Sequence, residues 1–460
     1  MLKRILTVLS ICVFMASSAI AGEQASEEQL KGKCMICHKR ESPGLYNQWS
    51  ESAHGKRNVT CYSCHQAQPG EPDAFMHEGL LIATLVTPKD CGRCHEKQRD
   101  QVAKSHHAKA GRILESLDNY LAGVMAGGPA AVNGCENCHG TKVKIDPASP
   151  NKLARGTWPN SGIGRINPDG SEGSCNACHS RHSFSKDQAR RPENCGKCHL
   201  GPDHPQKEVY EESKHGIAYR AAKDNGEMNM GKDKWVAGVD YFRAPTCATC
   251  HMGATQNQES THDVGTRLSW NLRPPVSKPQ ENGKEKRERM MDVCQACHGK
   301  TFVKGFYYQF DGLVNLYDEK FGKPAQEIME ILKKNKLLGK GAQFTNEVEW
   351  IYWELWHHEG RRARHGASMM GPDYTWWHGM YEVGKHFYMK FIPAVRQLSD
   401  KEANAYIDRL LASGWHKWFR NASPQETLEA LKSGALAESY QPLYFPPWER
   451  GTKHSNWYGK

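Results

Sequence analysis

Residues 175–199 read CNACHSRHSFSKDQARRPENCGKCH. This stretch contains the pattern C-x-x-C-H twice, starting at Cys175 and at Cys195, and one further histidine, His182, lies between the two copies. The pattern occurs six more times between residues 34 and 298. Of the 17 cysteines in the chain, all except Cys12 belong to one of these copies. The cysteines therefore predict one kind of site, repeated along the chain.

The C-x-x-C-H pattern is the attachment signal for c-type haem, in which two thiols bond to the porphyrin and the adjacent histidine binds the iron. We expect eight such haems. Their attachment cysteines are Cys34, Cys37, Cys61, Cys64, Cys91, Cys94, Cys135, Cys138, Cys175, Cys178, Cys195, Cys198, Cys247, Cys250, Cys294 and Cys297. The proximal iron ligands are His38, His65, His95, His139, His179, His199, His251 and His298.

Zinc sites and disulfides are the alternatives for so many cysteines. Zinc knuckles do not require a histidine directly after every second cysteine. Disulfides would leave all eight adjacent histidines unexplained. Both alternatives therefore account for less of the sequence than covalent haem does.

The remaining histidines indicate how many irons have a second ligand. The chain has 23 histidines, and a haem that only transfers electrons usually takes a second axial ligand, whereas a catalytic haem keeps one position open. Seven candidates for distal ligands are His54, His77, His107 (beside His106), His182, His215, His262 and one of His357, His358 and His365. Seven distal ligands for eight haems would leave one iron open.

Several stretches resemble the octahaem hydroxylamine oxidoreductases: CNACHSRHSFS at 175–185, RPENCGKCHLGPDH at 191–204, SKHG at 213–216 and APTCATCHM at 244–252. The resemblance extends over residues 33–300. It implies that the fourth haem, on Cys135 and Cys138 with His139 as proximal ligand, is the catalytic one. It also implies that Asp203 and His204 lie in the distal pocket, where a histidine beside a carboxylate can move protons near neutral pH.

Two positions depart from the oxidising members of that family. Where those members carry a pocket tyrosine, this chain has Arg273, whose guanidinium would suit the oxygens of nitrite. The match to the tyrosine that crosslinks to the catalytic haem of a neighbouring subunit is Tyr374, in surroundings that differ from the crosslinked form. Both departures favour the reductive branch of the family, and the resemblance implies a homotrimer.

The start of the chain predicts export. Residues 1–21 combine Lys3 and Arg4 with an apolar run too short to span a bilayer and a small-residue cleavage site. Because c-type haem is attached outside the cytoplasm, we expect a periplasmic protein, without a membrane span. The net charge of +10 fits pairing with haem carboxylates, and we expect no nucleic-acid partner.

The predicted fold class is mainly α. A loop-rich multihaem domain over 22–300 precedes a helical C-terminal domain over 301–436 and an aromatic, proline-rich tail over 437–460. Helices are predicted over 324–338, 346–358, 380–398, 400–411 and 423–431, the last with Ser423 and Glu426 forming a capping box. The run Arg361-Arg362-Ala-Arg364-His365 is interpreted either as a solvated charged face or as a partner for haem carboxylates.

The leading functional hypothesis is reduction of nitrite or hydroxylamine to ammonium, with electrons from a partner cytochrome or a quinol dehydrogenase. Asp203 and His204 would supply protons and Arg273 would hold a nitrite oxygen. The second hypothesis is an oxidase for hydroxylamine or hydrazine, which needs the bond between Tyr374 and haem. The third is an electron carrier in which histidine blocks all eight irons and His204 is an ordinary ligand.

We predict that the mature protein carries eight covalently bound haems, because its C-x-x-C-H motifs leave no cysteine unused. Intact mass spectrometry together with haem-stained gels should count eight. A mass that corresponds to six or fewer haems, with free thiols, would contradict the prediction.

Overall fold

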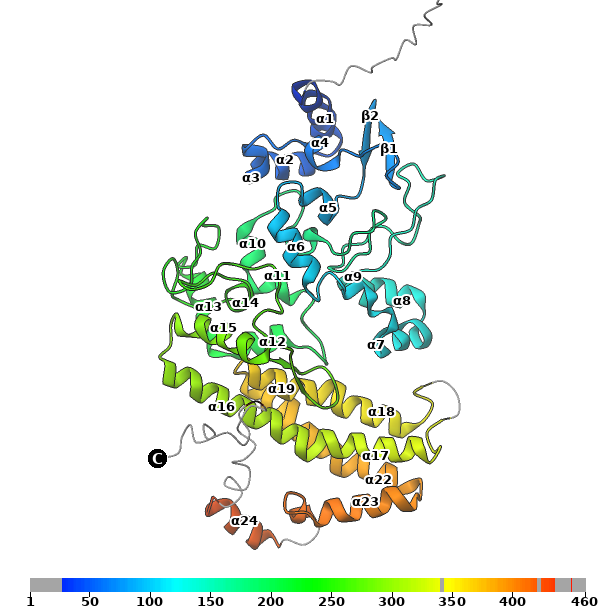
Figure 1. Ribbon diagram of the computed structural model, residues 1–460, viewed down its shortest axis with the longest axis vertical. Coiled ribbons are helices and arrows are strands. Elements are labelled where there is room, and N and C mark those ends of the chain that lie inside the picture. The colour runs from blue at the N-terminus through cyan, green and yellow to red at the C-terminus, as the bar shows by residue number, and fades with distance from the viewer. Residues whose placement is uncertain (1–26, 340–342, 420–422, 435–447, 449–460) are drawn as a thin grey trace, which may run out of the picture.

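The computed structural model describes residues 27–339, 343–419, 423–434 and Trp448 (Figure 1). The predicted export segment and, apart from Trp448, the predicted tail lie outside these residues. Helices dominate, and the only strands of the described part form two small antiparallel pairs, which confirms the mainly α fold class. No described helix has both the length and the apolar character needed to cross a membrane.

Short helices begin at or end in most of the C-x-x-C-H motifs. Three motifs form a helical turn of their own, namely α4 (Cys61–His65), α9 (Cys135–His139) and α14 (Cys247–His251). Four others lie in or beside α1 (Glu27–Glu41), α5 (Pro88–Cys91), α11 (Pro192–Gly196) and α15 (Gly283–Gln295). One helical turn places residues i, i+3 and i+4 on the same side, so both thiols and the histidine can face one porphyrin.

Capping side chains hold these turns in place. The hydroxyl of Thr60 accepts a hydrogen bond from the Ser63 backbone N–H at the start of α4, and Thr246 and Thr249 repeat this arrangement at α14. The motif at Cys175 begins in the short turn η3 (Cys175–Ala177). The other elements of this part are α2 (Pro43–Glu51), α3 (Ala53–Lys56), α6 (Glu96–Lys104), η1 (Ala110–Glu115), α7 (Leu117–Tyr120), η2 (Leu121–Ala126), α8 (Gly128–Asn133), α10 (Lys186–Arg190), α12 (Gln206–Glu212) and α13 (Lys214–Asp224).

A β-hairpin near the N-terminus carries one candidate ligand. Strands β1 (Ala74–His77) and β2 (Leu80–Ala83) pair around a two-residue turn in which Glu78 and Gly79 both have positive φ, as tight hairpin turns require. His77 is the last residue of β1 and therefore has a fixed direction. The second pair, β3 (Trp270–Asn271) and β4 (Lys278–Pro279), lies just before α15.

Three long helical segments and α23 pack together at the C-terminal side of the molecule (Figure 1). Each long segment is continuous through π-helical turns. The segments are α16 (Lys300–Tyr317), η4 (Asp318–Gly322) and α17 (Lys323–Lys334); α18 (Glu347–Trp353), η5 (Glu354–Gly360) and α19 (Arg361–Ser368); and α20 (Pro372–Thr375), η6 (Trp376–Tyr381), α21 (Glu382–His386), η7 (Phe387–Phe391) and α22 (Ile392–Gln397). The chain continues with α23 (Lys401–Ala412), η8 (Lys417–Phe419) and α24 (Pro424–Lys432).

These segments confirm the predicted C-terminal helices. The capping box of Ser423 and Glu426 is present at α24. The largest apolar core of the described residues joins α17, η7 and α23 through fully buried side chains such as Ile328, Phe391 and Ile407. The first helix predicted in this domain begins at residue 324, so the sequence analysis missed α16, which starts directly after the last motif. Polar residues such as Asp311 on its buried face weaken the helical apolar pattern there.

A buried ion pair anchors α16 to α15. Arg287 donates two hydrogen bonds to Asp311, each 2.8 Å long, and the Trp270 indole N–H donates a third, also of 2.8 Å. Both charged side chains are almost completely buried. A buried pair that is fully hydrogen-bonded can hold its charges away from water, and removing one partner would be strongly destabilising.

We predict that Leu332→Ala destabilises the C-terminal helices by about 2–5 kcal/mol, because Leu332 is fully buried in the largest apolar core. The matched control is Leu431→Ala on α24, where the side chain is 65% exposed and the cost should stay within about 0.5 kcal/mol. Urea unfolding followed by far-ultraviolet circular dichroism measures both. Equal losses of stability would place Leu332 outside the core.

Candidate active site

Six of the eight motif histidines lie opposite a second histidine. The ring centres are 6.0–6.5 Å apart in the pairs His38–His77, His54–His95, His65–His182, His107–His199, His179–His262 and His215–His298. Each pair joins one predicted proximal ligand to one predicted distal ligand. The structure thus places six of the seven candidates for distal ligands opposite a motif histidine.

The spacing of these pairs fits a haem iron between the rings. Metal–imidazole bonds are about 2 Å long, so two imidazoles on opposite sides of one metal have ring centres about 6 Å apart. The surroundings of the His215–His298 pair also suit a haem. A largely apolar cavity lies between these two histidines and the motif cysteines Cys294 and Cys297, and Tyr241 and Phe242 form part of its wall. None of the described cysteines forms a disulfide. The residues present therefore fit c-type haem.

Sulfur atoms of different motifs lie next to one another. Cys91 lies beside Cys175, Cys138 beside Cys198 and Cys195 beside Cys247. Because each cysteine marks the edge of a porphyrin, haems on these motifs would lie close together. The arrangement suits transfer of electrons from one haem to the next.

Two motif histidines, His139 and His251, have no second histidine ring opposite them among the described residues. The charged and titratable groups that act on the His139 ring are His204, Asp118 and Asp203, whereas those around His251 are His199 and Arg267. Acidic and proton-carrying side chains therefore gather near His139. His358 and His365, two of the three alternatives for the seventh distal ligand, face no motif histidine at this spacing.

His199 has two histidine neighbours, and only one has a nitrogen free to bind metal. The rings of His107 and His204 lie 6.0 Å and 6.3 Å from that of His199. In His204 both ring nitrogens have partners: Nδ1 donates to the Asp203 carboxylate and Nε2 donates to the Cys198 carbonyl at 3.1 Å. His107 is therefore the better candidate for the second ligand, which leaves His204 for proton chemistry.

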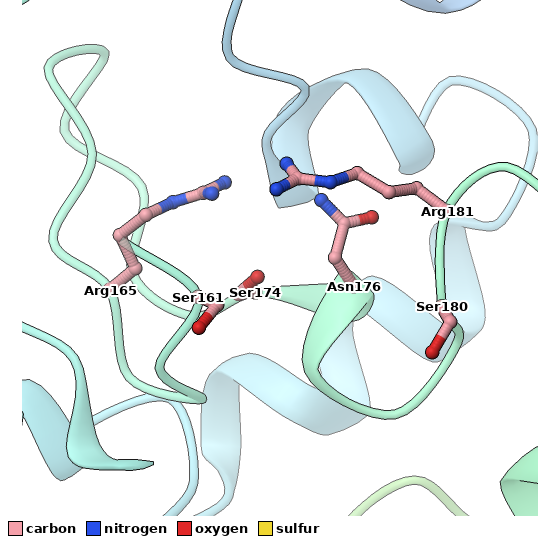
Figure 2. A pocket seen from close by; sticks show the side chains of 6 residues that line it. All are labelled: Ser161, Arg165, Ser174, Asn176, Ser180 and Arg181. Carbon is pink, nitrogen blue, oxygen red and sulfur yellow. The ribbon is translucent and has the colours of Figure 1, made fainter. Parts of the chain in front are cut away.

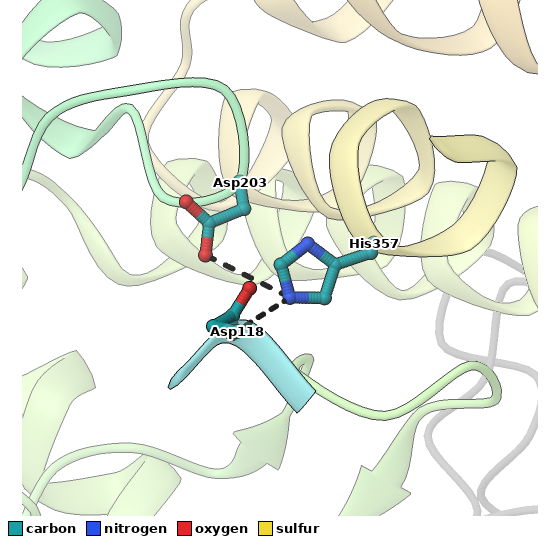
Figure 3. A group of neighbouring side chains, drawn as sticks. All are labelled: Asp118, Asp203 and His357. Atoms are coloured by element: carbon teal, nitrogen blue, oxygen red, sulfur yellow. Dashed lines mark hydrogen bonds and ion pairs between the residues drawn. The ribbon is translucent and has the colours of Figure 1, made fainter. Parts of the chain in front are cut away.

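Asp203 is the centre of a partly buried polar cluster. One carboxylate oxygen accepts from His204, and the other accepts from Arg361 at 3.1 Å and lies 4.0 Å from the His357 Nε2 atom. His357 in turn donates to Asp118 at 3.1 Å (Figure 3). Asp118, Asp203 and His357 have the residue types of a metal site. Since Arg361 already supplies a positive charge to Asp203, we interpret the cluster as a hydrogen-bonded network.

Three separate parts of the chain build this cluster. Asp203 lies in the loop between α11 and α12, and Asp118 lies in the first turn of α7. His357 and Arg361 are four residues apart across the junction of η5 and α19, so they share one helical face. His357 is 1% exposed and stacks on Trp353 with ring centres 3.7 Å apart, which fixes its direction.

The cluster changes the proton affinity of its members. Burial alone would raise the pKa of Asp203, but the hydrogen bond and charge of His204, together with His357 and Arg361, lower it well below its usual range. Burial alone would lower the pKa of His204, but its bonds to Asp203 and to the Cys198 carbonyl raise it above 6.5. The stable form is therefore an ionised Asp203 beside a His204 that holds its proton readily.

Arg361 was missed as a member of the site by the sequence analysis. It lies in the basic run, yet its side chain is largely buried, and its Nε atom donates to the Arg273 carbonyl at 2.8 Å. Arg364 of the same run is fully buried and donates to Gly360, Pro274 and Ser277. The interpretation of this run as a solvated charged face is therefore wrong, because Arg361 and Arg364 are largely buried and donate to protein carbonyls, a hydroxyl and a carboxylate.

Arg273 and Tyr374 lie in different surroundings. The Arg273 side chain is exposed, contacts Asn271 at 3.5 Å and forms no ion pair with a described carboxylate. Its backbone carbonyl accepts the hydrogen bond from Arg361, which links Arg273 to the site. Tyr374 lies on α20, where its backbone N–H donates to Glu212 at 3.2 Å and its ring is near that of His378.

The side chain of Gln206 connects the haem region to the C-terminal helices. Its Oε1 atom accepts from the His199 Nδ1 atom at 3.3 Å, and its Nε2 atom lies 3.4 Å from the Nδ1 atom of His365. His365 is partly buried, and burial lowers its pKa to about 3. The Gln206 amide thus contacts both His199, a predicted haem ligand, and His365 on α19.

Comparison with known proteins agrees with this geometry. A family described as "Seven times multi-haem cytochrome CxxCH" matches residues 169–347. A probable nitrite reductase–hydroxylamine oxidoreductase fusion protein of Kuenenia stuttgartiensis is 25% identical over 453 residues, which cover 75% of this chain and 49% of the relative. The chain thus spans about half the length of that curated relative.

Two solved structures have the same fold. A hypothetical multihaem protein is 26% identical with a TM-score of 0.69, over 84% of this chain and 96% of the other. The reducing complex of a hydroxylamine-oxidoreductase-like protein from Kuenenia stuttgartiensis is 20% identical with a TM-score of 0.59, over 84% of this chain and 88% of the other. At 20% identity, the likeness to this second structure shows a shared fold and nothing more.

The fold, the C-x-x-C-H motifs and the facing histidines define a multihaem cytochrome with covalently bound c-type haem. Within that class, this chain is similar in sequence and fold to hydroxylamine-oxidoreductase-like multihaem proteins.

We predict that His107→Ala creates an additional high-spin haem, whereas His204→Ala does not, because both ring nitrogens of His204 are already hydrogen-bonded. Low-temperature electron paramagnetic resonance and magnetic circular dichroism of the haem-loaded protein distinguish high-spin from low-spin iron. A new high-spin signal in the His204 variant alone would make His204 the ligand and His107 a bystander.

Proposed function

We propose that the chain is a periplasmic oxidoreductase that reduces nitrite, hydroxylamine or both to ammonium at the haem on Cys135 and Cys138. The single observation that carries the proposal is the cluster of Asp203, His204 and Arg361 near His139, the motif histidine around which acidic and proton-carrying groups gather. A haem held there would supply an iron atom that binds the nitrogen of the substrate and would transfer electrons one at a time. Seven further haems would store and deliver electrons.

Protons are the part of the reaction that these side chains supply. Reduction of nitrite to ammonium takes six electrons, and reduction of hydroxylamine takes two, with protons consumed in both. His204 holds a proton on Nδ1 beside an ionised Asp203 and can return to that state after giving it up. Asp118, which is 37% exposed, contacts the same Nε2 atom of His357 that faces Asp203, and it leads from the cluster towards solvent.

Arg361 and Arg273 would divide two tasks. Arg361 is bonded to Asp203 and to the Arg273 carbonyl, so it positions the carboxylate. The Arg273 guanidinium has no carboxylate partner among the described residues, so it can bind an anionic substrate as the sequence analysis suggested. The Kuenenia relative, whose name joins nitrite reductase and hydroxylamine oxidoreductase, supports this substrate class.

Two alternatives compete with this proposal. An oxidase acting on hydroxylamine or hydrazine would need a covalent bond between Tyr374 and a haem, which mass spectrometry of haem peptides would detect. An electron carrier would need a second ligand on every iron. Both ring nitrogens of His204 are already hydrogen-bonded, which favours an open iron site instead.

We propose further that the protein forms a homotrimer and takes electrons from a partner cytochrome or a quinol dehydrogenase.

We predict that Arg273→Leu lowers kcat/KM for nitrite by about one to two decades, the effect of losing one charge-assisted hydrogen bond of about 1.5–3 kcal/mol, and changes hydroxylamine turnover little. Steady-state reduction of both substrates with an artificial donor measures this. The comparison variant is Arg361→Leu, which should impair both substrates because Arg361 acts through Asp203. Equal losses on both substrates in the Arg273 variant would remove Arg273 from the substrate site.

We predict a pH dependence set by His204. Its raised pKa keeps the proton in place beyond 6.5, so reduction should decline on the alkaline side with an apparent pKa above that value. Asp203→Asn removes the charge that raises the pKa, so the decline should move towards lower pH. The profile of kcat/KM against pH for both proteins tests this, and an alkaline limb that stays in place in the variant would exclude His204 as the proton donor.

A further inference from the structure

A polar cavity of about 210 Å³ lies away from the Asp203 cluster and is lined by Ser161, Arg165, Ser174, Asn176, Ser180 and Arg181 (Figure 2). The guanidinium groups of Arg165 and Arg181 extend towards each other across it. None of the lining residues belongs to the Asp203 cluster, although Ser161 donates to Asn137 in the motif that starts at Cys135.

Arg165 is a buried charge without an opposite charge. Its side chain is 1% exposed, and its donors reach Asn167 Oδ1 at 2.6 Å, the Val86 carbonyl at 2.9 Å and the Asn160 carbonyl at 3.4 Å. All three acceptors are neutral. Burial and the charge of Arg181 lower the pKa of Arg165 to about 10, so it stays cationic at neutral pH. An unpaired buried cation is costly and is stabilised by a bound anion.

The other cavity residues also offer donors. The Ser174 hydroxyl is buried and has no hydrogen-bond partner among the described residues. Arg181 forms no ion pair with a described carboxylate, and its guanidinium lies 5.6 Å from the ring of Trp158, which also contacts Arg165 at 5.8 Å. The charge of Asp169 acts on Arg165 from a distance, but Asp169 forms no ion pair with it and accepts from Thr87 and Ser171. Two cations and an unused hydroxyl therefore face one cavity without a negative charge.

We propose that this cavity binds a compact oxyanion, held by Arg165, Arg181 and the Ser174 hydroxyl. This proposal does not rest on the proposed reduction of nitrite. Its occupant has one of two sources with the same chemistry. Ser174 precedes Cys175 and Arg181 precedes His182, so a haem carboxylate from a neighbouring motif is one source. A free carboxylate or inorganic phosphate is the other.

The test compares the haem-loaded protein with Arg181→Gln and Ser174→Ala, which leave the hydrogen bonds of Arg165 to the backbone intact. The matched control is Arg155→Gln, an exposed arginine in the same loop region that does not line the cavity. Spectroelectrochemical titration follows the midpoint potential of each haem. Isothermal titration calorimetry with acetate and with inorganic phosphate follows free anions.

If a haem carboxylate is the occupant, Arg181→Gln shifts the midpoint potential of one haem to a more negative value, because loss of a positive charge favours oxidised iron. If a free anion is the occupant, binding of acetate or phosphate weakens about ten- to a hundredfold in both cavity variants and the potentials stay unchanged. The proposal is overturned if the cavity variants match Arg155→Gln in both measurements. Neither readout depends on turnover of nitrogen compounds.

Discussion

The packing of the first 300 residues depends on the histidine pairs. The large apolar core lies in the C-terminal helices, and the apolar clusters elsewhere in the described chain are small. With 38% hydrophobic residues and a mean hydropathy of −0.73, the chain cannot enclose this region with side chains alone. The six facing histidine pairs, such as His38–His77 and His215–His298, mark where porphyrin faces take the place of a protein core.

The same constraint explains the many short helices. A covalent haem needs two thiols and an imidazole within one helical turn, so most motifs form or lie beside a short helix, and in some of them the residue before the first cysteine caps that turn. Thr60 and Thr246 show this clearly, since each caps a turn that starts with a motif cysteine. The longest described helix, α16, begins at Lys300, directly after the last motif.

Local patterns allowed much of this to be predicted from the sequence. Motif spacing identified the proximal histidines, and apolar periodicity together with capping residues identified helices such as α17 and α24. The Asp203 cluster could be predicted only in part, because His357 and Asp118 are 239 residues apart and Arg361 and Asp203 are 158 apart. A charged run on a helix gives no sign of which members will be buried. Arg361 became recognisable only once its partners were in place.

The amide of Gln206 has a consequence for where hydrogen atoms reside. Its oxygen fixes the hydrogen of His199 on Nδ1, which leaves Nε2 of that ring unprotonated and ready to bind metal. Its nitrogen donates to Nδ1 of His365, so in a neutral ring the hydrogen of His365 sits on Nε2. The two ends of an amide are not interchangeable, and one side chain therefore imposes opposite tautomers on two histidines from different parts of the fold. In that tautomer His365 has no free nitrogen with which to bind iron.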